Sequence, residues 1–398
     1  MLEMEQARAR ICAALTPLAA ESVPLNVAHG RIAAERVTAQ VALPPFDNSA
    51  MDGYAVRAAD VAGASAQTPV TLSLAGSVAT GSAATAAVTG GTCVRVFTGS
   101  SMPAGADAVV MQEDTRAEAG VLQVFDPVKP WENVRFQGED IKAGATVCER
   151  GDRLTPGRLG LLAGTGTHTV RVARRPLIGI VATGSELREA GQPLAPGQIY
   201  ESNRVLLAAL VEQAHAAARV YPVVPDTLAD TRAALATAFA ECDAVITSGG
   251  ASVGEVDHVK AALDALGGSL EFWRVRMKPG KPFIFGRHGP KPLFGLPGNP
   301  VATLVTFTLL VRPAILALQG AREVDSTVGQ GDLSAPLHNA GDRRHFVRVQ
   351  VDDQGHIQST GAQASHLLGS LAAANGLVDV PPGTTLAAGQ RVKVWWLG

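Results

Sequence analysis

The chain has 398 residues, and 46% of them are hydrophobic, so it holds enough apolar material for several buried cores. Its 34 basic and 36 acidic residues give a formal net charge of -2, without blocks of one sign. This balance argues against a general nucleic-acid-binding surface and against a surface for anionic membranes.

The N-terminal residues predict a cytoplasmic protein. Residues 1–10 carry acidic side chains where a secretory signal needs a basic region and an apolar segment. A strongly apolar stretch at 301–318 is interrupted by Arg312 and Pro313 after eleven residues, well short of the length of about 20 that spans a bilayer. We therefore expect a buried helix there and no membrane partner.

The first half of the chain predicts an N-terminal helix, a β-rich domain and a linking domain. Residues 3–20 are rich in helix formers and predict a helix. Between 44 and 138, short apolar runs alternate with Gly, Pro, Ser and Asp turns, which is typical of a β-rich domain. Residues 139–174 carry further short strand-like runs. We expect them to form one discontinuous linking domain with residues 1–43.

Residues 175–325 predict an α/β domain. Strands are expected at 177–182, 219–224 and 244–247, and helices at 202–217, 228–240, 256–266 and 300–318. Apolar strands that alternate with helices are typical of a doubly wound, parallel sheet buried on both faces. Strand-like runs return later, so residues 326–398 predict a small C-terminal β domain. The fold class is therefore α/β with β-rich subdomains in a multidomain chain.

In a doubly wound sheet, ligands bind beyond the carboxyl ends of the strands. Three expected strands are followed there by an acid or a glycine turn, at residues 183–186, 225–226 and 248–252. We expect Glu186 and Asp226 to supply carboxylates at one rim. Gly249 and Gly250 can adopt positive φ and turn backbone N–H groups toward a phosphate. Carboxylates beside phosphates form a natural site for Mg²⁺.

Each of these residues also has a purely structural interpretation. A glycine turn is an ordinary link between a strand and a helix, and an acid at a helix start is stabilising without any ligand. Asp257 lies five residues after Ser252, where it either caps the next helix or holds a cation. The expected convergence of three strand ends favours a binding site over coincidence.

Lysines are rare and concentrated in one region. Seven of the 34 basic residues are Lys, and four of the seven fall between 260 and 291. Lys278 and Lys281 flank a Pro-Gly turn, where a compact ammonium group either meets an oxyanion or is simply solvated. The chain has no Walker A, dinucleotide-binding or Gly-x-Ser-x-Gly motif, which disfavours ordinary ATPases, dehydrogenases and serine hydrolases.

Seven motifs occur in collinear order: Asp47-Asn-Ser-Ala-Met-Asp-Gly-Tyr-Ala-Val, Val96-Phe-Thr-Gly, Gly138-Glu-Asp-Ile, Thr183-Gly-Ser-Glu-Leu, Ser248-Gly-Gly-Ala-Ser, Met277-Lys-Pro-Gly-Lys-Pro and Gly295-Leu-Pro-Gly-Asn-Pro. Together they resemble the MoeA family, the molybdopterin molybdenumtransferases, which includes the gephyrin E domain. The resemblance runs from residue 3 to residue 396.

The resemblance implies an elongated homodimer with four subdomains per chain, of which the α/β one is similar to molybdopterin adenylyltransferases. It implies Mg²⁺-dependent insertion of molybdate into adenylylated molybdopterin with release of AMP. Further partners would be the adenylyltransferase and acceptor molybdoenzymes. Two alternatives stay open: an adenylyltransferase that releases pyrophosphate from ATP, and a non-enzymatic dimeric scaffold of the gephyrin E-domain type.

The resemblance also implies roles for single residues. Catalytic roles fall to Asp52, Thr98 and Asp140 from across the dimer interface, and to Asp226 and Lys278. Mg²⁺ is expected at Glu186 and Asp257. Substrate binding is expected at Gly249, Gly250, Ser252, Lys281, Pro297, Asn299, Arg348 and Ser365, and Lys278 and Arg348 are expected to gather molybdate. Arg274 departs from the family pattern, which often has Lys there.

Overall fold

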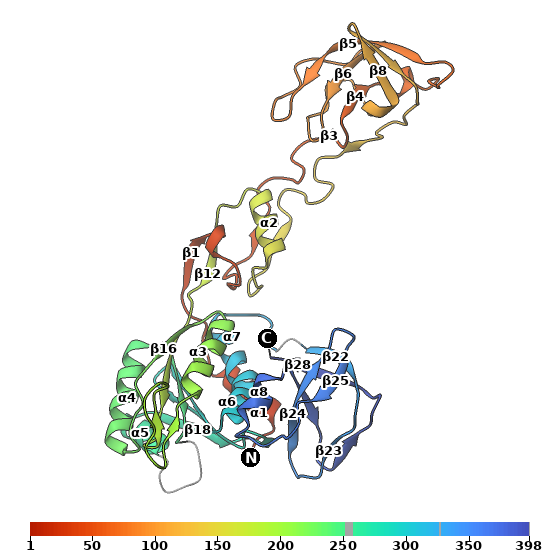
Figure 1. The fold of residues 1–398 in the computed structure, drawn as a ribbon. Coiled ribbons are helices and arrows are strands. Elements are labelled where there is room, and N and C mark those ends of the chain that lie inside the picture. The colour runs from red at the N-terminus through yellow and green to blue at the C-terminus, as the bar shows by residue number, and fades with distance from the viewer. Residues whose placement is uncertain (251–257, 326–327, 398) are drawn as a thin grey trace.

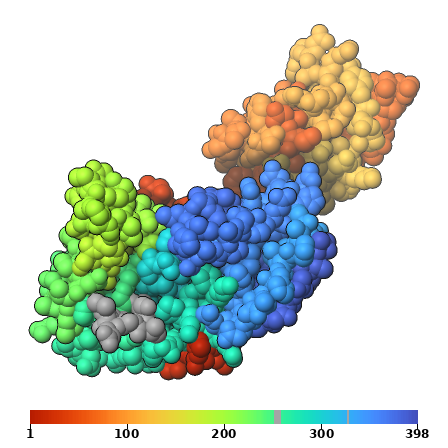
Figure 2. All heavy atoms as spheres, turned by 60° about the horizontal axis from the view of Figure 1, so that its bottom comes forward, coloured from red at the N-terminus to blue at the C-terminus, as the bar shows by residue number. Residues whose placement is uncertain are grey.

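The computed structural model describes residues 1–250, 258–325 and 328–397. The described residues fold into a β-rich part (48–135), a linking part (20–38 and 146–173), an α/β part (177–318) and a barrel (328–396). The chain is elongated, with the β-rich part at one end and the linking part between it and the rest (Figure 1). Figure 2 shows the α/β part packed against the barrel, while the β-rich part projects away from both.

The α/β part is built on one mixed sheet. Its strands, in spatial order, are β16 (Ala217–Val220), β13 (Leu177–Ala182), β17 (Ala244–Ser248), β21 (Lys291–Leu296), β20 (Pro282–His288) and β18 (Ser269–Arg274). The strands from β16 to β21 are parallel, whereas β20 and β18 form an antiparallel edge. The expectation of a wholly parallel sheet was wrong at this edge, because a two-residue link between β20 and β21 permits only a hairpin.

Helices cover both faces of this sheet. One face carries α3 (Asn203–Gln213), α6 (Pro300–Thr306), the π-helical turn η4 (Phe307–Val311), α7 (Arg312–Leu318) and α1 (Met4–Ala13), and the other carries α4 (Leu228–Glu241) and α5 (His258–Ala265). Alternate residues of β20 enter two different cores: Phe283 and Phe285 join the first, and Ile284 joins the second. The sheet is therefore buried on both sides, as expected.

The apolar stretch from residue 300 to residue 318 is one continuous helix. It passes through Arg312 and Pro313 without a break, so the helix expected at 300–318 is confirmed over its whole length. The wide π turn lies directly before Pro313, whose ring and missing N–H an α-helical turn tolerates poorly. Among the described residues this helix alone is long and apolar enough to span a membrane, but 89% of it is buried inside the protein, as in a core helix.

The N-terminal helix α1 packs on the α/β core and not with the linking part. It ends at Ala13, earlier than the predicted residue 20, and residues 20–24 form a strand instead. Met4, Ala7 and Ile11 lie on one side of α1 at helical spacing, and all three are buried in the core with η4 and α7. Residues 1–43 are therefore divided between two parts of the fold.

The linking and β-rich parts are formed by short strands. In the linking part, β1 (Ala20–Pro24) pairs with β12 (Thr169–Ala173) and β2 (Val37–Thr38) with β11 (Thr146–Cys148), beside α2 (Pro156–Gly164). The β-rich sheet has the order β7 (Ala108–Met111), β4 (Gly53–Val56), β6 (Thr92–Val96), β5 (Val70–Val78), β9 (Val121–Val124) and β8 (Thr115–Glu118). A separate ladder joins β3 (Asn48–Ser49) to β10 (Val134–Arg135). Short 3-10 turns occupy Leu25–Val27, Ala58–Asp60 and Gln112–Asp114.

The C-terminal strands close into a barrel. Its strands are β24 (Arg344–Val351), β25 (His356–Ser359), β22 (Val328–Leu333), β28 (Arg391–Trp396) and β26 (Gly376–Val380), and β26 pairs back onto β24. A smaller ladder joins β23 (Leu337–Asn339) to β27 (Thr384–Leu386), and α8 (Leu368–Ala372) lies beside α6. The α/β part contributes β19 (Met277–Lys278), which adds a parallel strand to β24. This ladder joins the barrel to the α/β part.

We expect Ile11→Ala to lower the free energy of unfolding by about 2–5 kcal/mol, because the fully buried side chain would leave a cavity between α1 and the α/β core. Urea unfolding followed by far-UV circular dichroism measures this. Val205→Ala is the matched control, since Val205 is 73% exposed on α3 and should change stability by no more than about 0.5 kcal/mol. Equally small effects of both substitutions would contradict the placement of α1.

Candidate functional site

Two cavities adjoin one another where the barrel meets the α/β part. The rim cavity, of about 510 Å³, opens beyond the carboxyl ends of β13, β17 and β21. The lysine cavity, of about 590 Å³, lies between the turn at 278–282 and the barrel loop at 363–366. Asn299 and His366 line both cavities. Both volumes fall within the range of about 300–1,000 Å³ that is usual for small-molecule sites.

The rim cavity brings three loops of the sheet together. Thr183 and Glu186 follow β13, Ser248 ends β17 and Gly249 follows it, and Gly298 and Asn299 follow β21; all of them line the cavity. Asn203, at the start of α3, joins two of these loops: its side-chain amide donates to Ser248 Oγ at 2.8 Å and to the Gly298 carbonyl at 2.7 Å. Strand ends that are far apart in the sequence therefore meet at one rim.

Gly249 allows the backbones of these loops to approach one another. Its φ is +88°, and a Cβ atom built on it would lie 2.5 Å from the Thr183 carbonyl oxygen. The Gly249 amide donates to the Leu296 carbonyl at 3.3 Å, so it contributes to the junction of β17 and β21 and does not point freely at a ligand. Gly250 also has positive φ, at +64°. The turn thus has the expected conformation, but one expected amide is engaged by the protein.

Glu186 and Asp226 have different surroundings. The Asp226 carboxylate accepts a hydrogen bond from the Ser185 amide at 3.1 Å, and the Asp226 amide donates to Ser185 Oγ at 3.2 Å. Asp226 therefore ties two rim loops together. Glu186 lines the rim cavity, and its carboxylate makes no hydrogen bond or ion pair within the described parts of the chain. The other acid of the cavity, Glu201, is paired with Arg204 at 2.9 Å.

A free carboxylate beside a ligand cavity fits Mg²⁺, which commonly takes one or two protein carboxylates and completes its shell with water and substrate phosphates. Glu186 offers such a group. The described residues contain no cluster of three or more His, Cys, Asp or Glu side chains that could hold a metal on their own. The second expected ligand, Asp257, and the expected substrate residue Ser252 lie outside the described residues.

The lysine cavity is lined by cations. Lys278, Lys281 and Arg343 face it together with Gln363, Ser365 and His366, and no acid is among the described residues that line it. Pro297 and Asn299 complete the wall toward the rim cavity, as expected for substrate-binding residues. Arg343 also pairs with the exposed Asp342 at 3.5 Å, whereas Lys278 and Lys281 form no ion pair with a described residue. The two lysines make this cavity suited to an oxyanion.

We expected Arg348 to face the lysine cavity, but it does not line this cavity. Its side chain is fully buried, and its Nη2 donates to the carbonyls of Ala362 and Ala364 at 3.0 and 3.2 Å. Its Nε donates to Ser370 Oγ at 3.1 Å, and burial lowers the pKa of its guanidinium. Arg348 therefore holds the loop that presents Ser365, and a direct contact with molybdate would require the loop to move.

The neighbouring His345 is also buried. Burial, followed by the charges of Lys278 and Arg348, lowers the pKa of His345 to about 4, so the ring is neutral at pH 7. Its Nε2 is buried and has no hydrogen-bond partner in the described parts of the chain. His345 thus adds no positive charge beside the two cations that shift its pKa.

Asp52 and Thr98 meet in the β-rich part. Asp52 Oδ1 accepts hydrogen bonds from the Thr98 amide and hydroxyl at 2.8 and 2.9 Å, and these bonds hold the pKa of Asp52 below its usual value. They adjoin β4 and β6, which Figure 1 places far from the α/β part of the same chain. Asp140 lies where the chain returns toward the linking part, and its amide donates to the Leu43 carbonyl at 3.1 Å. The fold therefore separates this group from the two cavities.

Sequence reasoning missed several residues of the site. Asn203, Gln363, Arg343 and His366 line the cavities or join their walls, and the sequence had assigned none of them a role in the site. A polar residue at the start of the helix after β13 is a general signal for the rim, and it could have indicated Asn203. Arg274, the departure from the family pattern, stacks on Trp273 at 3.7 Å and lines neither cavity.

Family models match nearly the whole chain. They describe the MoeA N-terminal region (domain I and II), a probable molybdopterin binding domain and the MoeA C-terminal region (domain IV), and they match residues 2–166, 179–317 and 330–397. The chain is 40% identical to the molybdopterin molybdenumtransferase of Haemophilus influenzae, with 99% of this chain and 98% of that protein covered. It is also 40% identical to molybdopterin molybdenumtransferase 2 of Mycobacterium tuberculosis, with 94% of each covered. The crystal structure of the molybdopterin biosynthesis MoeA protein from Pyrococcus horikoshii OT3 matches with a TM-score of 0.85 at 30% identity over 100% of both chains.

We expect Gly249→Ala to destabilise the protein more than Gly267→Ala. Both glycines have positive φ, at +88° and +76°, so both substitutions carry the backbone cost of about 1–2 kcal/mol. An added Cβ at Gly267 meets open space, whereas at Gly249 it meets the Thr183 carbonyl. Urea unfolding of the two variants measures the difference. Equal losses would show that the rim loops are not closely packed at Gly249.

Proposed function

The chain belongs to the MoeA family of molybdopterin molybdenumtransferases, and we propose from this that it inserts molybdate into adenylylated molybdopterin in a Mg²⁺-dependent reaction that releases AMP. The observation that carries the proposal is the pair of adjoining cavities, one beside a free carboxylate at the strand ends and the other lined by cations. Their shared wall at Asn299 and His366 allows one elongated substrate to occupy both.

The rim cavity would hold the adenylyl and pyrophosphate portion. Glu186, with Asp257 as the expected second ligand, would hold Mg²⁺ there, and the ion would supply positive charge that neutralises the phosphates. Asp226 would position the loop that carries Glu186, through its two hydrogen bonds to Ser185. Gly249, Gly250 and Ser252 would form the nucleotide-side turn.

The lysine cavity would hold molybdate beside the dithiolene of the pterin. Lys278 and Lys281 would attract the dianion, and Arg343 adds a third cation at the same wall. Ser365 would contact the anion from the barrel loop, which Arg348 fixes by its bonds to the carbonyls of Ala362 and Ala364. The chain's contribution is mainly to place the dianion next to the sulfur atoms and to offset its charge.

AMP release requires that the pyrophosphate link be cleaved. A water molecule would attack the phosphorus on the molybdopterin side, the bond between that phosphorus and the bridging oxygen would break, AMP would leave with the bridging oxygen, molybdopterin would keep its phosphate, and the released protons would pass to solvent. A molybdate oxygen that attacks instead would leave a link from phosphorus through oxygen to molybdenum, which water would then have to cleave. The cations of the site favour this step because negative charge accumulates on the phosphate oxygens as the bond breaks. The released cofactor would then pass to acceptor molybdoenzymes.

The working unit would be a homodimer in the cytoplasm. Asp52 and Thr98 lie far from the cavities of their own chain, so a second copy would have to bring them near (Figure 1). Hydrogen bonds from Thr98 lower the pKa of Asp52, which would act on the substrate from across the interface, with Asp140 where the chain returns toward the linking part. The adenylyltransferase that makes the substrate is the expected upstream partner.

Purified protein given adenylylated molybdopterin, Mg²⁺ and molybdate should release AMP and activate a molybdoenzyme that lacks its cofactor. Glu186→Gln should reduce this turnover by about tenfold or more, since it removes a charge-assisted metal contact. Glu212→Gln is the matched control, because Glu212 is exposed on α3 and outside both cavities. Full activity of Glu186→Gln would contradict the metal assignment, and pyrophosphate release from ATP would favour an adenylyltransferase instead.

A mixed dimer tests whether two chains build one site. Asp52→Asn and Glu186→Gln should each lose most of the activity when present in both chains, but a dimer that contains one of each variant has one site with both residues intact. After purification with two different tags, this mixed dimer should recover about half of the wild-type activity. If it is as inactive as each variant alone, Asp52 and Glu186 of different chains do not cooperate.

A further inference from the structure

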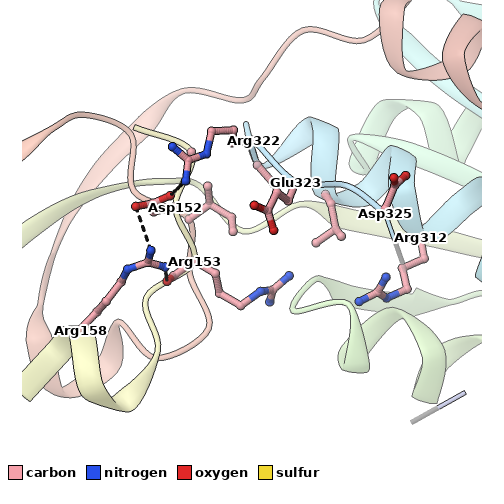
Figure 3. Close-up of a pocket in the computed structure, with 11 residues that line it drawn as sticks. Asp152, Arg153, Arg158, Arg312, Arg322, Glu323 and Asp325 are labelled. Carbon is pink, nitrogen blue, oxygen red and sulfur yellow. Dashed lines mark hydrogen bonds and ion pairs between the residues drawn. The ribbon is translucent and has the colours of Figure 1, made fainter. Parts of the chain in front are cut away.

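A third cavity lies away from the candidate site, where the linking part meets the end of α7. This junction cavity has a volume of about 210 Å³. The linking part contributes Arg153 and Arg158, and the α/β side contributes Arg312 and Arg322 (Figure 3). None of its lining residues belongs to the rim or lysine cavity.

Two of the four arginines have acidic partners. Arg158 and Arg322 both pair with Asp152, at 3.1 and 2.7 Å. Asp325, which also lines the cavity, pairs with Arg8 at 3.0 Å. Asp152 and Asp325 are therefore already paired, and Glu323 is the one acid among the described lining residues that has no ion pair.

Arg153 and Arg312 are the two arginines of the cavity that form no ion pair with a described residue. Their side chains extend toward one another across the cavity (Figure 3). Arg153 Nη1 makes one long hydrogen bond, of 3.3 Å, to the Gly30 carbonyl. Arg312 Nη1 is buried and has no hydrogen-bond partner in the described parts of the chain. Two partly buried like charges facing each other are costly unless an anion lies between them.

The electrostatics of neighbouring groups agree with this geometry. Burial lowers the pKa of Arg153, and burial followed by the charge of Arg153 lowers the pKa of Arg312. Burial and then Arg153, with smaller effects from His29 and other cations, lower the pKa of His215 as well. The charge of Arg153 therefore reaches both Arg312 and His215. Glu323 stands at the cavity without an ion pair to any described residue.

We propose that the junction cavity binds a free, compact tetrahedral oxyanion, of the size and charge of inorganic phosphate or sulfate, between Arg153 and Arg312. Guanidinium groups bind such oxyanions through paired, charge-assisted hydrogen bonds. The volume lies below the range of about 300–1,000 Å³ that is usual for larger ligands, so the site is sized for an ion with its waters. The bound ion would join the linking part to α7, and so connect two parts of the elongated chain.

Inorganic phosphate is the probe. Hydrogen–deuterium exchange of the full-length protein, with calorimetry alongside, should show that phosphate protects peptides that cover residues 150–158 and 312–322. Arg153→Gln and Arg312→Gln should each weaken binding at this place by about tenfold or more, because each removes charge-assisted hydrogen bonds. Glu323→Gln should strengthen it, since the substitution removes a negative charge beside the ion.

Lys281→Gln is the matched control, because it removes one positive charge from the lysine cavity and should leave protection at 150–158 and 312–322 unchanged. Circular dichroism establishes that each variant is folded, and the two arginine variants test the same site from opposite walls. Protection that is absent from these peptides, that is retained in both arginine variants, or that is lost in Lys281→Gln would overturn the proposal.

Discussion

The ladder between β19 and β24 is the constraint on which the candidate site depends. Met277 and Lys278 leave the α/β part and pair with Arg344 and His345 of the barrel, so one short strand belongs to both parts. Arg344 reinforces this joint through ion pairs to Glu5 of α1 and Asp379 of β26. The turn that carries the two lysines is thereby held against the barrel loop. Without the ladder, the lysine cavity would lack one wall.

Hydrophobic packing supports the same joint. Phe346 and Leu377 come from the barrel, yet they belong to the core that also contains α1, α6 and α7. Phe346 packs edge-on against Trp395 with their ring centroids 6.0 Å apart. The barrel and the α/β part therefore share one core, and shared cores resist relative motion more than polar interfaces do. The β-rich part has separate cores of its own, which leaves its orientation to the slender linking part.

The rim of the site could be predicted from the sequence because its signals are local. An apolar strand followed by glycines or an acid is visible in a single segment, and the rule for parallel sheets brings such segments to one edge. The family motifs then indicated the chemistry. The role of Arg348 in holding the barrel loop and the packing of α1 on the α/β core could not be predicted in this way. Both depend on which distant carbonyls and side chains surround them. A buried arginine and a surface arginine look alike in a sequence.

The chain enters and leaves the β-rich part through two adjacent segments. The Leu43 amide donates to the Ile141 carbonyl at 2.8 Å, and the Gly138 amide donates to the Pro44 carbonyl at 2.9 Å. Outgoing and returning segments thus run within hydrogen-bond distance of each other at the base of the β-rich part. A single tight turn at that base could replace the whole excursion and leave the remaining chain connected. Removal of the β-rich part would thus spare the cores of the body, but it would take Asp52 and Thr98 away with it.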